Sequence, residues 1–226
     1  MSAARLEAQS PVTSMRWPAI DAIAAMAPLA PGYRFELLQR SEVAALIGAI
    51  AQWYPDISVG SASCFLREDF YTEKVFLAGE TERDFIVILF KRDDELAGML
   101  SIERDCEAMT LYGRLGIIAP VHRGAHLSLN ILQVLEPIGQ AMEMGFVYGM
   151  ATLKVPHIQV AFERLGYRLL GFTPGFDREL VAPGIVKRVY EAIYAKVLVP
   201  EEDLLRPAPE NLTPKTRALF ELLFPG

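Results

Sequence analysis

Apolar side chains recur along this chain with two different periods, which predict alternating strands and helices. Residues 85–90 read FIVILF, an unbroken apolar run typical of a central strand that is covered on both faces. The turn RDDE and the alternating residues 96–103 follow, so the two segments predict an antiparallel hairpin. Residues 111–119 predict a third strand of this meander. Gly113 and Gly116 lie inside it, and glycine in a strand often marks a bulge or a close approach.

Helical periods occupy several of the segments between these strands. Apolar positions three and four residues apart predict a helix over residues 41–53, with Ser41 as its N-cap, and a second helix over residues 61–73. Residues 124–145 predict a long amphipathic helix, which Pro137 should kink or divide because proline removes a backbone hydrogen bond.

Four further segments complete the pattern. Residues 33–39, 146–152 and 167–172 predict strands, and residues 156–166 predict a helix that starts with proline and ends with glycine. Residues 185–199 fit a helix by spacing and a strand by their Val, Ile and Tyr content, so both interpretations stay open. The order of elements predicts a mixed α/β fold of the α+β type, with a largely antiparallel first half.

The ends of the chain differ in character from this central part. Residues 1–32 are rich in alanine and interrupted by prolines, which predicts an N-terminal extension on the surface. Residues 33–199 form the predicted domain, and residues 200–226 form a tail whose short helix begins at Thr213 and Pro214. The apolar side chains of that helix would dock on the domain or on a second subunit, so a homodimer is one interpretation.

A strand, a short turn and a helix follow one another between residues 110 and 145. This arrangement brings unpaired backbone N–H groups and the positive end of the helix dipole to one point. Such a point favours anions, so the segment predicts a phosphate-binding site.

Composition restricts the class of partner. The formal charge is −6 with no run of Lys or Arg, which excludes an electrostatic footprint for nucleic acid and favours a cationic small substrate. No segment is apolar enough for a membrane span, and no signal peptide is evident, so we expect a soluble protein of the cytoplasm. The two cysteines, Cys64 and Cys106, lack metal-ligand spacing, which suits a reducing compartment and predicts no metal site.

Two segments carry a recognisable family pattern. Residues 116–132, GIIAPVHRGAHLSLNIL, resemble the strand, Pro-x-x-Arg-Gly turn and helix that hold acetyl-CoA in the GNAT acyltransferase superfamily. Residues 161–172, AFERLGYRLLGF, resemble the later helix and strand of that family. The resemblance covers residues 33–198 and implies a GNAT-like, mostly antiparallel central sheet flanked by helices.

The chain departs from the family pattern at three places. His126 stands where family members have a central glycine, and Phe162 stands where many have a tyrosine that protonates the departing thiolate. Pro156 and His157 occupy the region where an asparagine is often found.

The resemblance implies acetyl-CoA or another acyl-CoA as co-substrate. Backbone amides of residues 121–128, with the charge of Arg123, would anchor the phosphates, and residues 117–119 would offer donors to the pantetheine arm and the thioester oxygen. The predicted cofactor-binding residues are Ile117, Ile118, Ala119, Val121, His122, Arg123, Gly124, Ala125, His126, Leu127 and Ser128.

The catalytic candidates are groups that could move a proton. Glu103, at the end of a strand beside the cofactor strand, is the predicted base that deprotonates an ammonium. Tyr148 and either Tyr190 or Tyr194 are candidate proton donors, and His157 lies near the site by motif position. The acceptor wall would come from the first two helices and their joining loop, which hold Trp53, Tyr54, Phe65, Phe70 and Tyr71.

These residues predict an N-acyltransferase that moves an acetyl or other acyl group from acyl-CoA directly to the amine of a small molecule. One alternative keeps the fold but takes a long acyl chain from an acyl carrier protein. A second alternative is a non-catalytic module for CoA binding or protein interaction, because a fold alone does not determine function.

Overall fold

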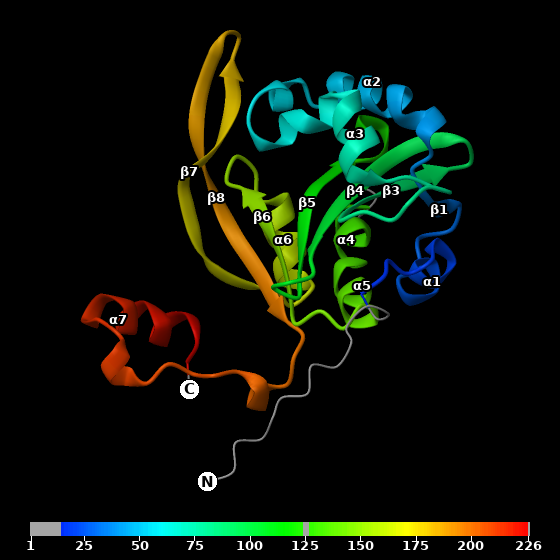
Figure 1. Cartoon of the computed structure of the whole chain (residues 1–226). Helices are drawn as coiled ribbons and strands as arrows, with labels where there is room; N and C mark the ends of the chain where they lie inside the picture. Colours follow the sequence, from blue (N-terminus) through cyan, green and yellow to red (C-terminus); the bar gives the residue numbers. More distant parts are fainter. Residues whose placement is uncertain (1–14, 124–126, 226) are drawn as a thin grey trace.

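A single sheet of eight strands organises the computed structural model, which describes residues 15–123 and 127–225 (Figure 1). The strands are β1 (Tyr33–Leu37), β2 (Val75–Phe76), β3 (Phe85–Arg92), β4 (Glu95–Asp105), β5 (Thr110–Ile118), β6 (Phe146–Thr152), β7 (Arg168–Ala182) and β8 (Ile185–Val197). The α-helices are α1 (Ile20–Met26), α2 (Val43–Trp53), α3 (Glu68–Lys74), α4 (Leu127–Leu132), α5 (Leu135–Ala141), α6 (His157–Arg164) and α7 (Pro214–Leu223). Short 3-10 turns are η1 (Arg40–Glu42), η2 (Pro55–Ser58), η3 (Ser61–Leu66), η4 (Pro120–His122), η5 (Glu201–Asp203) and η6 (Pro209–Asn211).

The strands lie in the order β1-β3-β4-β5-β6-β8-β7, with the short β2 beside β3. The β5–β6 and β2–β3 pairs are parallel, and the other pairs are antiparallel. This mostly antiparallel sheet with flanking helices confirms the predicted α+β fold class.

Helices cover both faces of the sheet and form two apolar layers (Figure 1). One layer packs side chains of α1, α4, α5 and α6 against the sheet, including Ile23, Ile138 and Phe162. The other layer packs α2, η3 and α3 on the opposite face, including Ile50 and Tyr71. The buried FIVILF strand contributes side chains to both layers, as a run covered on both faces should.

The segment that periodicity left open is a strand. Residues 185–197 form β8, which pairs with β6 on one side and β7 on the other. Its partner β7 continues to Ala182, ten residues beyond the predicted end at residue 172, so the two make a long hairpin (Figure 1). The pairing of this segment with two neighbouring strands makes it extended rather than helical. The spacing of apolar residues within one segment carries no information about such pairing.

The predicted long helix is divided in two. Proline at position 137 has no N–H to donate to the carbonyl of Gln133, four residues earlier, and α4 ends at Leu132 while α5 begins at Leu135. The predicted cap at Ser41 is wrong, because Gln39 caps the preceding turn η1 in a reciprocal capping box with Glu42.

The two ends of the described chain behave differently. Trp17, Ile23 and Ala27 are buried in the core, so this part of the segment assigned to a surface extension packs against the domain. Helix α7 begins at Pro214 with Thr213 as its N-cap, as predicted, and the Thr213 hydroxyl accepts a hydrogen bond from the N–H of Thr216 at 3.3 Å. Its Leu219 and Leu222 are 52% and 76% exposed, so the apolar face of α7 is largely uncovered within this chain.

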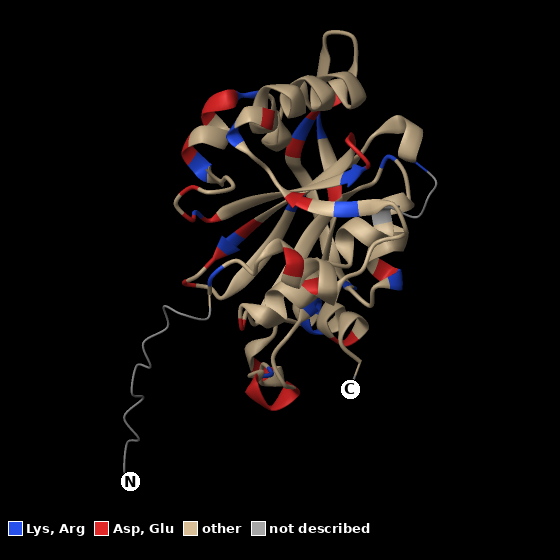
Figure 2. Cartoon of the chain, turned by 90° about the vertical axis from the view of Figure 1, so that its right-hand side faces the viewer, with Lys and Arg blue, Asp and Glu red and all other residues tan. Residues whose placement is uncertain are grey.

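Charged side chains of both signs are interspersed along the ribbon, with an acidic stretch at η5 (Figure 2). Across residues 15–123 and 127–225, no helix has both the length and the apolar character that a membrane crossing requires.

Gly149 of β6 provides a test of the packing between sheet and α6. A methyl group at Gly149 would lie 2.5 Å from Cζ of the Phe162 ring, which is fully buried. We expect Gly149→Ala to lower the free energy of unfolding by about 1–3 kcal/mol through overpacking. Urea denaturation measures this change.

Gly48 of α2 is the matched control, because a methyl group there meets no atom within 4 Å. Gly48→Ala should stabilise the protein by about 0.5–1 kcal/mol through helix propensity. Equal effects of the two substitutions would contradict the packing described for Gly149.

Candidate active site

The sheet opens between β5 and β6. These two strands are parallel, and only a short part of each is paired: residues Thr110–Gly113 of β5 pair with residues Phe146–Gly149 of β6. Beyond Gly113, β5 continues alongside β4, whereas β6 continues alongside β8. The result is a fork in the middle of the sheet (Figure 1).

A β-bulge lies at the point where the fork begins. On β4, Ser101 faces Leu115 and Ile102 faces Gly113, which leaves Arg114 as the extra residue of β5. A bulge bends its strand and increases the local twist, so it accounts for the departure of β5 from β6.

The fork leaves backbone groups of β5 without a strand partner on one side. The N–H of Ala119 donates to the C=O of Ala97 on β4 at 2.8 Å, whereas the N–H and C=O of Ile118 point the other way and bond the hydroxyl of Tyr54. Because successive residues of a strand alternate direction, Gly116 presents its backbone groups to the same open side as Ile118.

A cavity of about 190 Å³ lies at this fork and has lining residues from both faces of the sheet. The wall on the α4 and α6 side is apolar and consists of Leu100, Gly116, Ile118, Ile131, Leu132, Ile158 and Phe162. The wall on the opposite side is largely polar and includes Ser61, Tyr112, Arg114, Thr152, Asp177, Arg178, Glu179 and Glu191.

Three carboxylates of the β7–β8 hairpin face this cavity. Burial, together with the negative charges of Asp177 and Glu179, raises the pKa of Glu191 to about 7. Asp177 accepts hydrogen bonds from the N–H and the hydroxyl of Ser61, both at 2.7 Å, and Glu179 pairs with Lys154. Unlike these two neighbours, Glu191 makes no side-chain hydrogen bond or ion pair in the described part of the chain.

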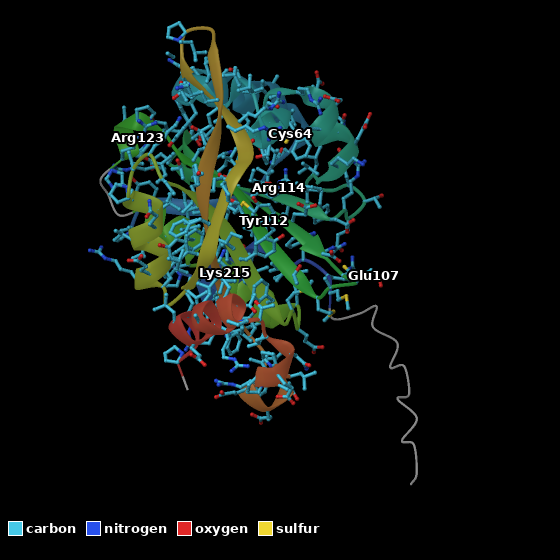
Figure 3. The ribbon with its side chains drawn as sticks, turned by 90° about the vertical axis from the view of Figure 1, so that its left-hand side faces the viewer. Cys64, Glu107, Tyr112, Arg114, Arg123 and Lys215 are labelled. Atoms are coloured by element: carbon cyan, nitrogen blue, oxygen red, sulfur yellow. The ribbon has the colours of Figure 1, made fainter. Side chains whose placement is uncertain are left out.

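Tyr112 lies beside these carboxylates at the base of the fork. Its ring stacks on that of Tyr148 at 4.7 Å between centroids, and the Arg114 guanidinium lies 5.5 Å from its centre (Figure 3). Burial raises the pKa of Tyr112 to about 12, so its hydroxyl stays protonated at neutral pH.

The predicted catalytic residues lie outside the cavity lining. Glu103 accepts a hydrogen bond from Arg114 at 2.9 Å, which holds its carboxylate as an ion pair. Tyr148 lies behind Tyr112, and Tyr190 is 60% exposed on the hairpin. Tyr194 donates to Glu163 at 2.8 Å, and His157 is exposed at the start of α6.

The predicted cofactor residues are divided among several environments. Ile118 reaches the open edge of β5, whereas the side chains of Ile117 and Ala119 are buried, and Val121 is 77% exposed. His122 is buried, and its Nδ1 lies 3.0 Å from the hydroxyl of Tyr33, so its ring supports the turn.

Arg123 is exposed at the mouth of the fork, and its guanidinium lies 4.9 Å from the centre of the Tyr54 ring (Figure 3). The predictions for Gly124, Ala125 and His126 fall outside the described residues. Leu127 and Ser128 form the start of α4.

The aromatic residues predicted for the acceptor wall are mostly core residues. Phe65, Phe70 and Tyr71 pack edge to face in the layer under α2 and α3. The segment that joins the two predicted helices does line the cavity, through Ile57, Val59, Ser61 and Ala62.

Glu191, Asp177, Glu179 and Tyr112 were missed by sequence reasoning. The three carboxylates belong to the long hairpin, which could not be assigned while residues 185–199 fitted two structures. Tyr112 precedes Gly113 on the predicted third strand. The two glycines in this strand were the available signal, because glycine in a strand often marks a place where a ligand or another backbone segment comes close.

No protein-family model and no curated protein sequence matches this chain. Solved structures do match it in fold. One is the ribosomal L7/L12 α-N-protein acetyltransferase RimL in complex with coenzyme A, with 12% identity, a TM-score of 0.57, and coverage of 76% of this chain and 97% of that one.

Two further matches belong to the same fold. The spermidine N-acetyltransferase SpeG from Vibrio cholerae gives 12% identity, a TM-score of 0.59, and coverage of 74% and 95% of the two chains. The IAA acetyltransferase from Bacillus cereus gives 9% identity, a TM-score of 0.53, and coverage of 74% and 99%. The chain has the GNAT fold, as the two sequence segments predicted.

The environment of Glu191 predicts an unusual titration. Carboxyl-carbon NMR should give a midpoint near 7 for Glu191. Asp177→Asn should move this midpoint downward, because it removes a negative charge that disfavours ionisation. A midpoint in the ordinary range of glutamate in the unchanged protein would contradict the burial of this group.

The raised pKa of Glu191 also determines how the stability of the protein changes with pH. The folded protein holds the proton of Glu191 more tightly than the unfolded chain does, so stability relative to Glu191→Gln falls as pH rises from about 4.5 to about 7. Thermal unfolding of the two proteins at matched pH values measures this difference.

Proposed function

We propose that this chain is an N-acyltransferase that moves a short acyl group from acyl-CoA to the amine of a small molecule by direct transfer. The cavity at the fork carries the proposal, because one wall is apolar and the other carries carboxylates. An acyl donor and an ammonium group need these two environments, and here they meet in one space.

The open edge of β5 supports binding of the donor. Gly116 and Ile118 direct backbone N–H and C=O groups to the unpaired side, where an extended arm with amide groups can pair as a strand would. Backbone N–H groups fixed in this way also stabilise the negative charge that develops on a thioester oxygen during attack.

The turn before α4 is the proposed phosphate site. Arg123 is exposed there and supplies positive charge. The amides of residues 124–128 remain the proposed donors to the pyrophosphate. The N–H groups of His122 and Arg123 are not proposed as donors, because they already donate to the C=O groups of Ala119 and Pro120 within the turn η4.

Glu191 is the proposed base, in place of Glu103. An amine attacks a thioester only when neutral, so a bound ammonium must first lose a proton. Glu191 can accept this proton, since a pKa of about 7 is close to the working pH and its carboxylate makes no ion pair with the residues that the structure describes. Asp177 and Glu179 supply the negative potential that attracts a cationic acceptor.

Tyr112 is the proposed proton donor to the departing thiolate. Phe162 lines the cavity but has no proton to give, whereas Tyr112 also lines it and keeps its hydroxyl protonated at neutral pH. In the balanced reaction, the ammonium loses one proton to Glu191, which releases it to solvent, and a second on amide formation. The thiolate gains one proton from Tyr112, which the second proton restores.

The cavity volume bears on the acyl group. About 190 Å³ is below the roughly 300–1,000 Å³ of pockets that enclose drug-sized ligands. This favours acetyl or a similarly short group over the long chain of an acyl-carrier donor.

The test measures thiol release from acetyl-CoA, longer acyl-CoAs and an acyl-carrier donor across a panel of small amines. We expect turnover with a short acyl-CoA and a cationic amine, and about a 10²-fold or larger loss of kcat in Glu191→Gln. Glu103→Gln is the matched control and should retain most activity. CoA binding without turnover on any amine would instead favour the non-catalytic module.

Arg123→Ala tests the phosphate site separately. Loss of this charge should weaken CoA binding about tenfold, with little change in the free energy of unfolding, because the side chain is exposed. Isothermal titration calorimetry measures the affinity, and Arg206→Ala in the tail is the control for a surface arginine. Equal affinity in all three proteins would remove Arg123 from the site.

A further inference from the structure

Tyr54 makes an unusual contact with the open edge of β5. Its hydroxyl donates to the C=O of Ile118 at 3.2 Å and accepts from the N–H of the same residue at 3.3 Å. One side chain thus bonds both backbone groups of Ile118, which the departure of β6 leaves without a strand partner.

Arg123 holds Tyr54 from the other side. The Arg123 guanidinium lies 4.9 Å from the centre of the Tyr54 ring, a cation–π distance. The same guanidinium donates to the C=O of Ile118 and to the C=O of Trp53, both at 3.4 Å. The end of α2, the edge of β5 and the turn before α4 therefore meet at one cluster, formed by Trp53, Tyr54, Ile118 and Arg123.

We propose that Tyr54 and Arg123 form a latch over the edge of β5, and that an acyl donor must displace the Tyr54 hydroxyl to bind. This inference rests on the proposed function. An extended donor arm offers an N–H from one amide and a C=O from another, and these would bond the C=O and the N–H of Ile118, the two groups that Tyr54 now uses. The two cannot occupy Ile118 together, so they compete.

The bond lengths suit a contact that is exchanged. Both hydrogen bonds lie at or beyond the long end of the ordinary range, and the hydroxyl can turn to water when released. Tyr54 immediately precedes η2, whose Ile57 lines the cavity, so the latch also joins the donor edge to the acceptor wall.

Tyr54→Phe tests the latch because it keeps the ring that Arg123 covers and removes only the competing hydroxyl. We expect this variant to bind CoA about three- to tenfold more tightly than the unchanged protein, since one or two weak hydrogen bonds no longer need to break. Isothermal titration calorimetry with CoA measures the change. Arg123→Ala cannot replace this variant, because Arg123 also belongs to the proposed phosphate site.

Tyr33→Phe is the matched control. The Tyr33 hydroxyl also supports η4, through His122, but it does not reach the edge of β5. We expect CoA affinity in this variant to stay within about twofold of the unchanged protein. Similar tightening in both variants would overturn the latch, because it would show that a looser turn, not the freed edge, improves binding.

A second measurement requires no ligand. Amide hydrogen exchange at Ile118 should be faster in Tyr54→Phe, because the N–H loses its acceptor. Unchanged exchange, or CoA affinity that is equal or weaker in Tyr54→Phe, would overturn the proposal. Failure of the proposed function looks different: the unchanged protein and the variant would both show neither CoA binding nor acyl transfer, even with faster exchange at Ile118.

Discussion

The short parallel pairing of β5 with β6 is the constraint on which the rest of the site depends. Four residue pairs hold the two strands together, and the bulge at Arg114 then separates them. Without this separation, β6 would satisfy the backbone groups of Gly116 and Ile118, and the cavity would close. The antiparallel strands on either side keep the fork rigid, because β4 and β8 each hold one arm along its length.

The fork also explains why chemistry from distant parts of the chain meets there. Apolar side chains from α4 and α6 reach it from one face, and the β7–β8 hairpin brings carboxylates from the other. A carboxylate near apolar walls and like charges keeps its proton to higher pH, which is the condition a base for ammonium groups requires. The electrostatic character of Glu191 is thus a consequence of topology.

Local patterns in the sequence predicted the strands of the meander, the division at Pro137 and the cap at Thr213, because each depends on neighbours within a few residues. Two other contacts could not be predicted from the spacing of residues along the sequence, because they join separate segments of the chain. These are the ion pair of Glu103 with Arg114 and the contact of His122 with Tyr33. The hairpin that carries Glu191 was ambiguous for the same reason, since β8 is a strand only because β6 and β7 flank it. Glu191 lies in that ambiguous segment, whereas Asp177 and Glu179 lie on β7 beyond residue 172, where the predicted strand ended.

The contact between Phe162 and Gly149 has a consequence for evolution of the site. The tip of the phenyl ring, Cζ, points at the place where any larger residue at Gly149 would put its side chain. A hydroxyl on that carbon would enter the same space and meet the backbone of β6. A tyrosine at position 162 is therefore sterically incompatible with β6 in its present place, and the residue at this position stays a phenylalanine as long as this packing is kept.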